Sequence, residues 1–339
     1  MNRRKFVVMS TVLMLALTVA ITGLAYYSNF AAKAFQQTLP AAISYLPANT
    51  QAVFGINVQK LVNSPIYAQA MAKHGAEIAA NLAEFTTKTG VNPSTDIDYI
   101  IGAGRPAQQK GAGVIIAVGS FKQNLIIDFI NSHGTPIRLF YNDAVVLMIP
   151  ETNASGAKLE KGVAFLNDNN IALGDLESLK AVLDVYKHPS ATNATLPAMV
   201  ANLDPREMFW FAGDATVLSK LPQNTPLTPS LSAIQSVFGI LDLESADKGV
   251  TITINGNVTV TAKDATAATQ LGDFVRGLVA LGNLMGGQNP DLAALIGVVK
   301  VERPKDNQLK ITLNIPFDFM QKLEAAKGKF GVDVPLRIK

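Results

Sequence analysis

The feature that most constrains this chain is an uninterrupted apolar run near its beginning. Residues 6–27 carry no charge and are mostly apolar, and Arg3, Arg4 and Lys5 directly precede them. As an α-helix this run would span about 33 Å, because each helical residue adds about 1.5 Å, and the hydrocarbon core of a bilayer is about 30 Å thick. Positively charged flanks stay on the cytoplasmic side of a membrane. We therefore expect residues 6–27 to cross the inner (cytoplasmic) membrane once, with the bulk of the chain in the periplasm.

A cleavable signal peptide is the alternative interpretation of the same run. Ala32, Lys33 and Ala34 provide small residues around a possible cleavage site after Ala34. The apolar segment of an ordinary signal peptide is about 7–15 residues long, and this run is longer. Its length favours a retained signal anchor. Both alternatives place the body of the chain outside the cytoplasm, and the sequence leaves cleavage open.

The charge balance argues against a nucleic-acid partner. The chain has 29 Lys and Arg residues against 26 Asp and Glu residues, and the three basic residues before the apolar run account for the whole excess. Nucleic-acid binding depends on basic surfaces that neutralise phosphates, so we expect none here. The chain also has no cysteine, which excludes disulfides, thiolate metal sites and cysteine catalysis.

The sequence offers no motif of an established catalytic or cofactor site. It contains no P-loop, no dinucleotide-binding glycine pattern, no zinc-protease motif and no serine-hydrolase elbow. His74, His133 and His188 each end a predicted helix, just before Gly or Pro, where a cation is favoured by the helix dipole. We therefore expect no metal, no cofactor and a non-catalytic protein.

Two acidic pairs provide the alternative of an enzyme. Asp96 and Asp98 lie two residues apart at the start of a predicted strand, and Asp242 and Glu244 have the same spacing in the corresponding strand of the second half. Both side chains of each pair can therefore share one face. Paired carboxylates can perform acid–base chemistry, which would make the protein a hydrolase of unknown type. Charges at strand ends are also typical of simple solvated positions.

An uncharged stretch in the second half is the best candidate for an interaction surface. No charge occurs between Arg276 and Asp291, and two glycines there have the GxxxG spacing that permits close helix approach. The stretch is too short to span a bilayer, and a buried core helix would show the same pattern. We predict that it contacts the N-terminal anchor, a protein partner in the envelope or a lipid surface. The residues of this surface are Leu278, Val279, Leu281, Gly282, Leu284, Met285 and Gly286.

Hairpin and helix signals alternate along the rest of the chain and predict an α+β fold, with antiparallel sheets and helices packed on one face. Both halves show a strand, helix, strand, strand, helix order, which favours two duplicated modules. In the second half we expect the first of these helices near residues 229–237. The predicted divisions are a cytoplasmic tip and anchor (1–28), a connector (29–50), a first module (51–190), a linker (191–205) and a second module (206–339).

Three short signals are specific enough to place element ends. Ser64 followed by Pro65 predicts the start of a helix. Asn142 and Asp143 predict a tight hairpin turn between two strands. A Gly at position 90 predicts the end of the helix that begins near Ser64.

Two stretches resemble N-terminally anchored bacterial envelope proteins of unknown function: LPANTQAVFGINVQKLVNSPIY (46–67) and GVAFLNDNNIALGD (162–175). In those proteins an anchor precedes an LPA(D/N)T entry, a strand and a helix that starts near Ser-Pro. The resemblance implies an extracytoplasmic protein and supplies no catalytic residues. The predicted anchor, the low charge of the body, the lack of catalytic motifs and the uncharged stretch after Arg276 lead us to expect an accessory or scaffold subunit of an envelope complex. The alternative is an envelope binding module for a lipid or other apolar ligand, held by a concave sheet face against helices such as residues 264–285.

Overall fold

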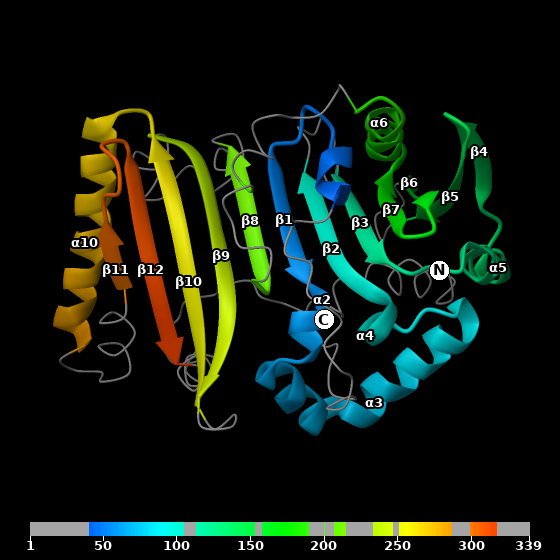
Figure 1. The fold of residues 1–339 in the computed structure, drawn as a ribbon, viewed down its shortest axis with the longest axis horizontal. Coiled ribbons are helices and arrows are strands. Elements are labelled where there is room, and N and C mark those ends of the chain that lie inside the picture. The colour runs from blue at the N-terminus through cyan, green and yellow to red at the C-terminus, as the bar shows by residue number, and fades with distance from the viewer. Residues whose placement is uncertain are drawn as a thin grey trace. The chain divides into compact units, whose positions relative to one another are not determined.

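The chain divides by its contacts into two compact units, Met1–Val217 (unit 1) and Leu218–Lys339 (unit 2). In the described residues, unit 1 combines an antiparallel sheet with several helices, and unit 2 combines an antiparallel sheet with one long helix (Figure 1). The α+β class is therefore confirmed. The predicted duplication is not shown by the elements that can be described. The computed structural model describes residues 41–104, 113–152, 158–189, 200, 207–214, 233–246, 251–286 and 299–316.

The sheet of unit 1 has the strand order β8–β1–β2–β3–β7–β6–β5–β4, and every neighbouring pair is antiparallel. Most neighbours in the sheet also follow one another along the chain; the pairs β3–β7 and β1–β8 do not. The strands are β1 (Ala52–Asn57), β2 (Ile97–Gly104), β3 (Gly113–Gly119), β4 (Ile137–Tyr141), β5 (Ala144–Thr152), β6 (Lys158–Asn167), β7 (Asn170–Asp175) and β8 (Phe209–Asp214).

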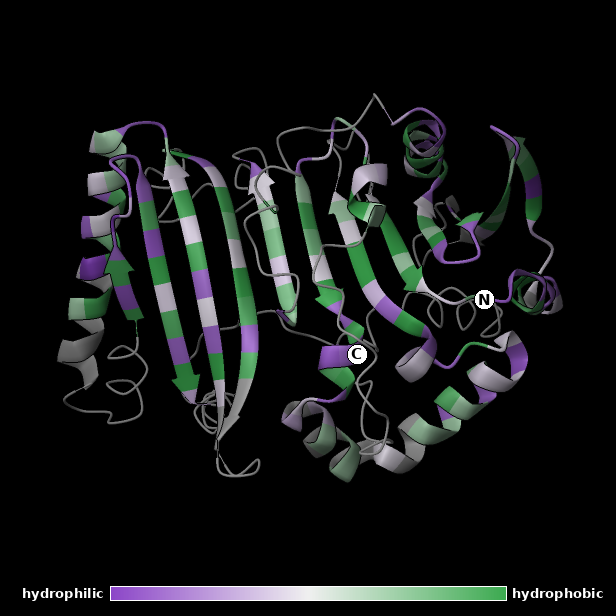
Figure 2. Ribbon diagram, in the orientation of Figure 1, coloured by the Kyte–Doolittle hydropathy of each residue, from purple (hydrophilic) through white to green (hydrophobic). Residues whose placement is uncertain are grey.

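Helices pack on both faces of this sheet, so the prediction of one covered face is wrong for unit 1. Along β6, Val163 packs in a cluster with α3 and α5, whereas Gly162 lies close to Leu179 of α6. Successive side chains of a strand point to opposite faces. The near-continuous apolar runs of β2 and β3 (Figure 2) need cover on both sides. The helices are η1 (Ala41–Tyr45), α2 (Val58–Val62), α3 (Pro65–Thr89), α4 (Pro93–Asp96), α5 (Gln123–His133) and α6 (Leu176–Lys187).

The longest helix of unit 1, α3, begins and ends at its sequence signals. The Ser64 side chain accepts a hydrogen bond from the backbone N–H of Tyr67 (3.2 Å), and Pro65 occupies the first helical position. Gly90 ends the helix in the left-handed region (φ 66°), and its N–H donates to the Thr86 carbonyl (2.8 Å). Both predicted ends are therefore confirmed.

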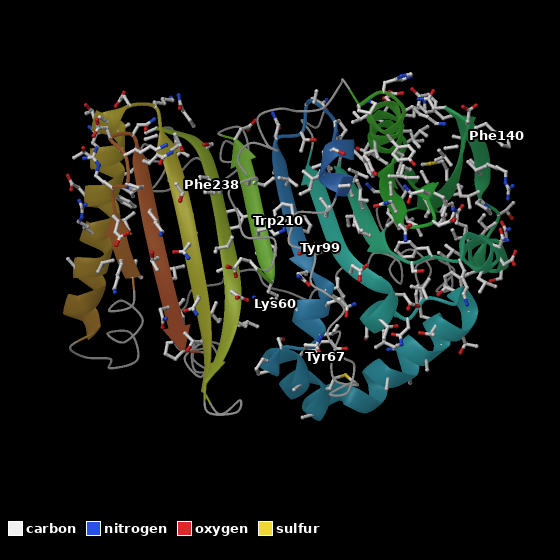
Figure 3. The ribbon with its side chains drawn as sticks, in the orientation of Figure 1. Lys60, Tyr67, Tyr99, Phe140, Trp210 and Phe238 are labelled. Atoms are coloured by element: carbon white, nitrogen blue, oxygen red, sulfur yellow. The ribbon has the colours of Figure 1, made fainter. Side chains whose placement is uncertain are left out.

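Strand β8 completes the sheet of unit 1 although it lies far along the chain. It pairs with β1, and Trp210 lies directly opposite Gly55. The indole of Trp210, which is labelled in Figure 3, is fully buried. We expected this strand to belong to a second module that starts at residue 206, whereas the contacts divide the chain between Val217 and Leu218. The reason is that β1 needs a partner on its second edge, and β8 supplies it.

The sheet of unit 2 has the order β11–β12–β10–β9, again antiparallel throughout. Helix α10 packs on one face, where its Ala268 and Leu271 are buried with Val260 and Leu309 of the sheet. Polar and apolar residues alternate along these strands, as their banded colours show (Figure 2). The elements are β9 (Ile234–Ala246), β10 (Thr251–Ala262), α10 (Ala265–Gly286), β11 (Val299–Glu302) and β12 (Gln308–Pro316).

The start of β9 corrects another prediction. We expected a helix near residues 229–237, but Ile234 already belongs to the strand and Val237 lies opposite Val260 of β10. Apolar residues three apart fit a helix, and they also fit a strand that carries an irregularity. Here the long ladder with β10, which includes such an irregularity near Ala262, supplies backbone partners that a short isolated helix would lack.

The predicted membrane anchor at residues 6–27 lies outside the residues that the structure describes. Within the described ranges, no helix combines the length and the apolar character needed to cross a bilayer. The anchor therefore stays a prediction.

Candidate functional site

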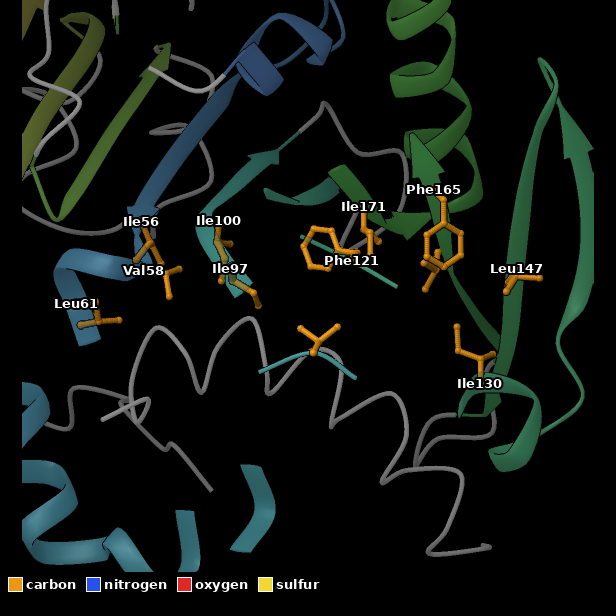
Figure 4. Close-up of a cluster of buried hydrophobic side chains, with 12 residues drawn as sticks. Ile56, Val58, Leu61, Ile97, Ile100, Phe121, Ile130, Leu147, Phe165 and Ile171 are labelled. Carbon is orange, nitrogen blue, oxygen red and sulfur yellow. The ribbon is translucent and has the colours of Figure 1, made fainter. Parts of the chain in front are cut away.

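Unit 1 contains an apolar cavity between its sheet and the helices α3 and α5. The cavity volume is about 80 Å³, and the hollow encloses about 670 Å³ when its open mouth is included. Figure 4 shows part of its wall, with Ile100, Phe121 and Ile171 among the labelled side chains. The lining residues are Phe85, Thr89, Val91, Ile97, Ile100, Ile115, Ala117, Phe121, Ile126, Phe129, Ile130, Val163, Ile171 and Leu173.

The end of α3 forms one wall of the cavity. Two aromatic rings meet there edge to face, Phe85 of α3 and Phe129 of α5, with their centroids 5.9 Å apart. Thr89 is the polar residue of this wall. Its hydroxyl donates to the Phe85 carbonyl (2.8 Å) and accepts from the Val91 N–H (3.2 Å), so its hydrogen-bonding groups are already engaged by the backbone.

The connection from β3 to α5 places Phe121 over the opposite wall. The turn between β6 and β7 holds this connection, because Phe121 N–H donates to the Asp168 carbonyl (3.0 Å) and the Asn169 side-chain amide donates to the Gly119 carbonyl (2.8 Å). A Cβ at Gly119 would lie 1.9 Å from the Asp96 carbonyl oxygen. Only glycine permits this close approach of the backbones.

The chemistry available in the cavity is that of apolar binding. The described residues that line it are apolar except for Thr89, and none of them is an acid, a base or a metal ligand. A polar group placed there without a hydrogen-bond partner would lose its hydration. The arrangement therefore suits a hydrocarbon and does not suit a charged or strongly polar molecule.

The interaction surface predicted from the sequence lies elsewhere, on the C-terminal half of α10 in unit 2. Val279 is half-buried. Gly282 and Gly286 belong to α10, and the side chains of Leu278, Leu281, Leu284 and Met285 lie outside the described part of the structure. The N-terminal half of the helix is the half that contributes to the described core of unit 2.

The acidic pairs lie outside the cavity lining. Asp96 accepts hydrogen bonds from the Asn92 N–H (2.8 Å) and the Thr95 hydroxyl (2.9 Å), which stabilise the short helix α4. Asp242 accepts from the Leu243 N–H (2.8 Å). The Glu244 side chain falls outside the described residues. These contacts give the aspartates a local structural role.

The histidines follow the sequence prediction in part. His188 ends α6, and its N–H donates to the Asp184 carbonyl (2.8 Å). His133 is the last residue of α5, as predicted, whereas His74 lies inside α3, so the prediction that it ends a helix is wrong. The side chains of both residues lie outside the described part of the chain. Among the residues that are described, no three His, Cys, Asp or Glu side chains gather as metal ligands would.

The cavity was missed by sequence reasoning. One signal was present, since Phe85 lies on the apolar face of the predicted helix that became α3. The cavity itself is the space left between side chains of two helices and four strands, and its existence depends on how closely those elements approach. Periodicity in one element cannot reveal that distance.

Comparison of this chain with known protein families, sequences and structures identifies no family. No protein-family model and no curated protein sequence matches the chain. Two solved structures are similar to it: crystal form IV of TP0453, at 8% identity and a TM-score of 0.46, over 87% of this chain and 100% of that one, and crystal form I of TP0453, at 7% identity and a TM-score of 0.41, over 86% and 99%. Likenesses this weak carry no argument about function.

Proposed function

We propose that this protein is a membrane-anchored, extracytoplasmic, non-catalytic binding protein that holds an apolar ligand, a lipid acyl chain, in the cavity of unit 1. The single observation that carries the proposal is the cavity between α3, α5 and the sheet, with its apolar lining. Apolar pockets with few polar groups are the usual form of binding sites for apolar molecules.

The size and lining of the cavity favour the end of a chain over a bulky ligand. At about 80 Å³ it is smaller than an engineered apolar cavity of about 150 Å³ that stays dry and binds benzene. Each methylene moved from water into such a site contributes about 0.8 kcal/mol. A polar headgroup would stay at the open mouth, since the lining offers it no hydrogen-bond partner.

The proposed localisation of the protein is supported by the sequence. The uncharged run at residues 6–27 behind three basic residues supports one membrane span with the rest of the chain in the periplasm. A bilayer beside the protein would be the source of its ligand.

The second candidate function is that of a scaffold subunit in an envelope complex, as predicted from the sequence. It depended on the uncharged half of α10, which gives no described geometry. A pull-down of the tagged full-length chain from membranes separates the two functions. A stoichiometric protein partner would favour the scaffold, and a clean protein that carries lipid would favour the binding module.

The direct test uses a photoactivatable fatty acid with a terminal diazirine, added to membranes that contain the full-length chain. Cross-linked peptides, mapped by mass spectrometry, should come from the end of α3 and from α5. Ile126→Gln places an amide in the cavity lining and should lower this cross-linking at least about tenfold, because a buried amide without a partner costs about 2 kcal/mol or more.

The matched control is Leu125→Gln, one residue earlier on the same helix, where the side chain is exposed to solvent. It should leave cross-linking unchanged. Equal cross-linking of both variants, or labels confined to the membrane-spanning run, would refute the proposed ligand site. Circular dichroism of both variants confirms that each still folds.

A further inference from the structure

The outer edge of the unit 1 sheet carries an exposed apolar strand. β4 ends the described strand order, and its Phe140 and Ile137 are 76% and 47% exposed. The other large apolar side chains that are described as exposed reach only 37% and 39%. Figure 3 shows Phe140 at the outer margin of this strand. The edge of a sheet presents backbone N–H and C=O groups to which a strand of another chain can pair.

The strand is held firmly in place, as a binding edge must be. The turn residues Asn142 and Asp143 adopt positive φ (49° and 61°) and set the register in which Tyr141 lies opposite Ala144. Two hydrogen bonds tie the hairpin to α6: the Tyr141 hydroxyl and the Asn142 amide both donate to Oδ1 of Asp184 (2.8 Å each).

This register decides which backbone groups face outward. In a hairpin with a two-residue turn, the residues that flank the turn exchange hydrogen bonds, and hydrogen-bonded pairs then alternate along the strands. Tyr141, Leu139 and Ile137 therefore direct their N–H and C=O groups toward β5. Arg138 and Phe140 direct theirs toward the free edge.

We propose that a second copy of this chain pairs with β4 in antiparallel fashion about a two-fold axis at Leu139. Arg138 of each copy then lies opposite Phe140 of the other, so the outward N–H and C=O groups of both residues are satisfied. The guanidinium meets the aromatic ring on one face of the joined sheet, a favourable cation–π arrangement. The interface is the same patch on both copies, as two-fold symmetry requires.

Other symmetric registers fit less well. An axis at Arg138 places two guanidinium groups opposite each other, and like charges in that position are destabilising. An axis at Phe140 leaves Ile137 outside the paired segment. The register centred on Leu139 covers both exposed apolar residues and pairs each positive charge with a ring. This self-complementarity favours a second copy over an unrelated extended peptide.

The absence of cysteine in the chain permits a test of the register itself. Under the proposal, Leu139 of one copy faces Leu139 of the other in a non-hydrogen-bonded pair, with Cα atoms about 4.5 Å apart, within disulfide range. Leu139→Cys in the full-length chain should therefore form a disulfide dimer on mild oxidation in native membranes. Ile137→Cys and Phe140→Cys should give at least about tenfold less disulfide dimer, because in each of these variants the two equivalent cysteines lie two or more residues out of register.

A second measurement removes any contribution of the cysteine. Phe140→Lys in the detergent-solubilised full-length chain should weaken self-association at least about tenfold in sedimentation equilibrium, whereas Leu125→Lys, an exposed control on α5, should not. A monomer at all concentrations would overturn the proposal. So would equal disulfide formation at all three positions, or a Leu139→Cys cross-link to a different protein. None of these outcomes bears on the apolar cavity.

Discussion

Replacement of Gly55 by alanine tests the pairing of β8 with β1. A Cβ at this position would lie 2.1 Å from Cε2 and Cζ2 of the Trp210 indole. The indole is fully buried, so it cannot turn away into solvent. The ring, or the strand that carries it, would have to retreat by about 1 Å or more before the contact became an ordinary one.

The expected loss of stability follows from that clash. Overpacking of a well-packed core costs about 1–3 kcal/mol, and a rigid ring within a paired strand places Gly55→Ala in the upper part of that range. The substitution also stabilises the folded state by about 0.5–1 kcal/mol, because alanine lowers the conformational entropy of the unfolded chain relative to glycine. We expect a net loss of about 2 kcal/mol, which lowers the urea midpoint by about 1 M at a slope of about 2 kcal/mol per molar.

The assay is urea unfolding followed by tryptophan fluorescence, since Trp210 is the only tryptophan in the chain. Gly104→Ala is the matched control in the neighbouring strand β2, because its Cβ would meet only the Ala52 Cβ at 3.9 Å. The control should unfold within about 0.5 kcal/mol of the wild type. If both variants unfold at the same urea concentration, the indole does not lie against Gly55 and the pairing is refuted.

Two further predictions concern the ends and the interior of helices. Asp175 caps α6: its carboxylate accepts hydrogen bonds from Ser178 N–H (2.9 Å), Ser178 Oγ (2.7 Å) and Gly113 N–H (3.0 Å). Burial raises the pKa of this carboxyl, but the hydrogen bonds and Lys161 together outweigh burial and hold the pKa below its usual value. A lowered pKa in the folded state stabilises the fold above the unfolded-state value of about 3.9, and this contribution is lost as the pH falls through the folded-state pKa. Asp175→Ala should therefore lower the free energy of unfolding by about 1 kcal/mol at pH 7. In urea unfolding, the difference in this free energy between the variant and the wild type should become smaller below about pH 4. A difference that stays constant down to pH 2 would contradict the role of the Asp175 carboxylate as the cap. In α10, no atom lies within 4 Å of the Cβ that Gly277→Ala would add. The higher helix propensity of alanine should stabilise unit 2 by up to about 1 kcal/mol and so raise its midpoint of thermal unfolding. A lower midpoint would show that the added methyl group meets a neighbour.

Local elements were the predictable part of the fold. The start of α3 at Ser64, its end at Gly90 and the hairpin turn at Asn142 and Asp143 each follow from a side chain or a backbone angle that acts within a few residues. Such signals do not depend on distant parts of the chain, so the sequence alone supports them. The same holds for the α+β class, because the strand and helix patterns are both present and short.

Long-range pairing was the unpredictable part. β8 carries the apolar pattern of a strand, and nothing in that pattern states that its partner is β1, more than 150 residues earlier in the chain. The start of β9 was likewise decided by its ladder with β10, which overrode a helix-compatible spacing. Local propensity is a weak guide wherever a partner strand supplies hydrogen bonds.

The sequence by itself determined the charge balance, the absence of cysteine chemistry, the apolar run at residues 6–27, both ends of α3 and the turn between β4 and β5. These properties depend on composition or on contacts within a few residues. The tertiary structure decided which strands pair, which faces helices cover, and that Phe85 and Phe129 leave an apolar cavity between α3, α5 and the sheet. It also decided that Phe140 is exposed on β4, the last strand in the described order of the sheet. Both sites depend on distances between elements that are remote in sequence, and those distances are set only when the whole core packs.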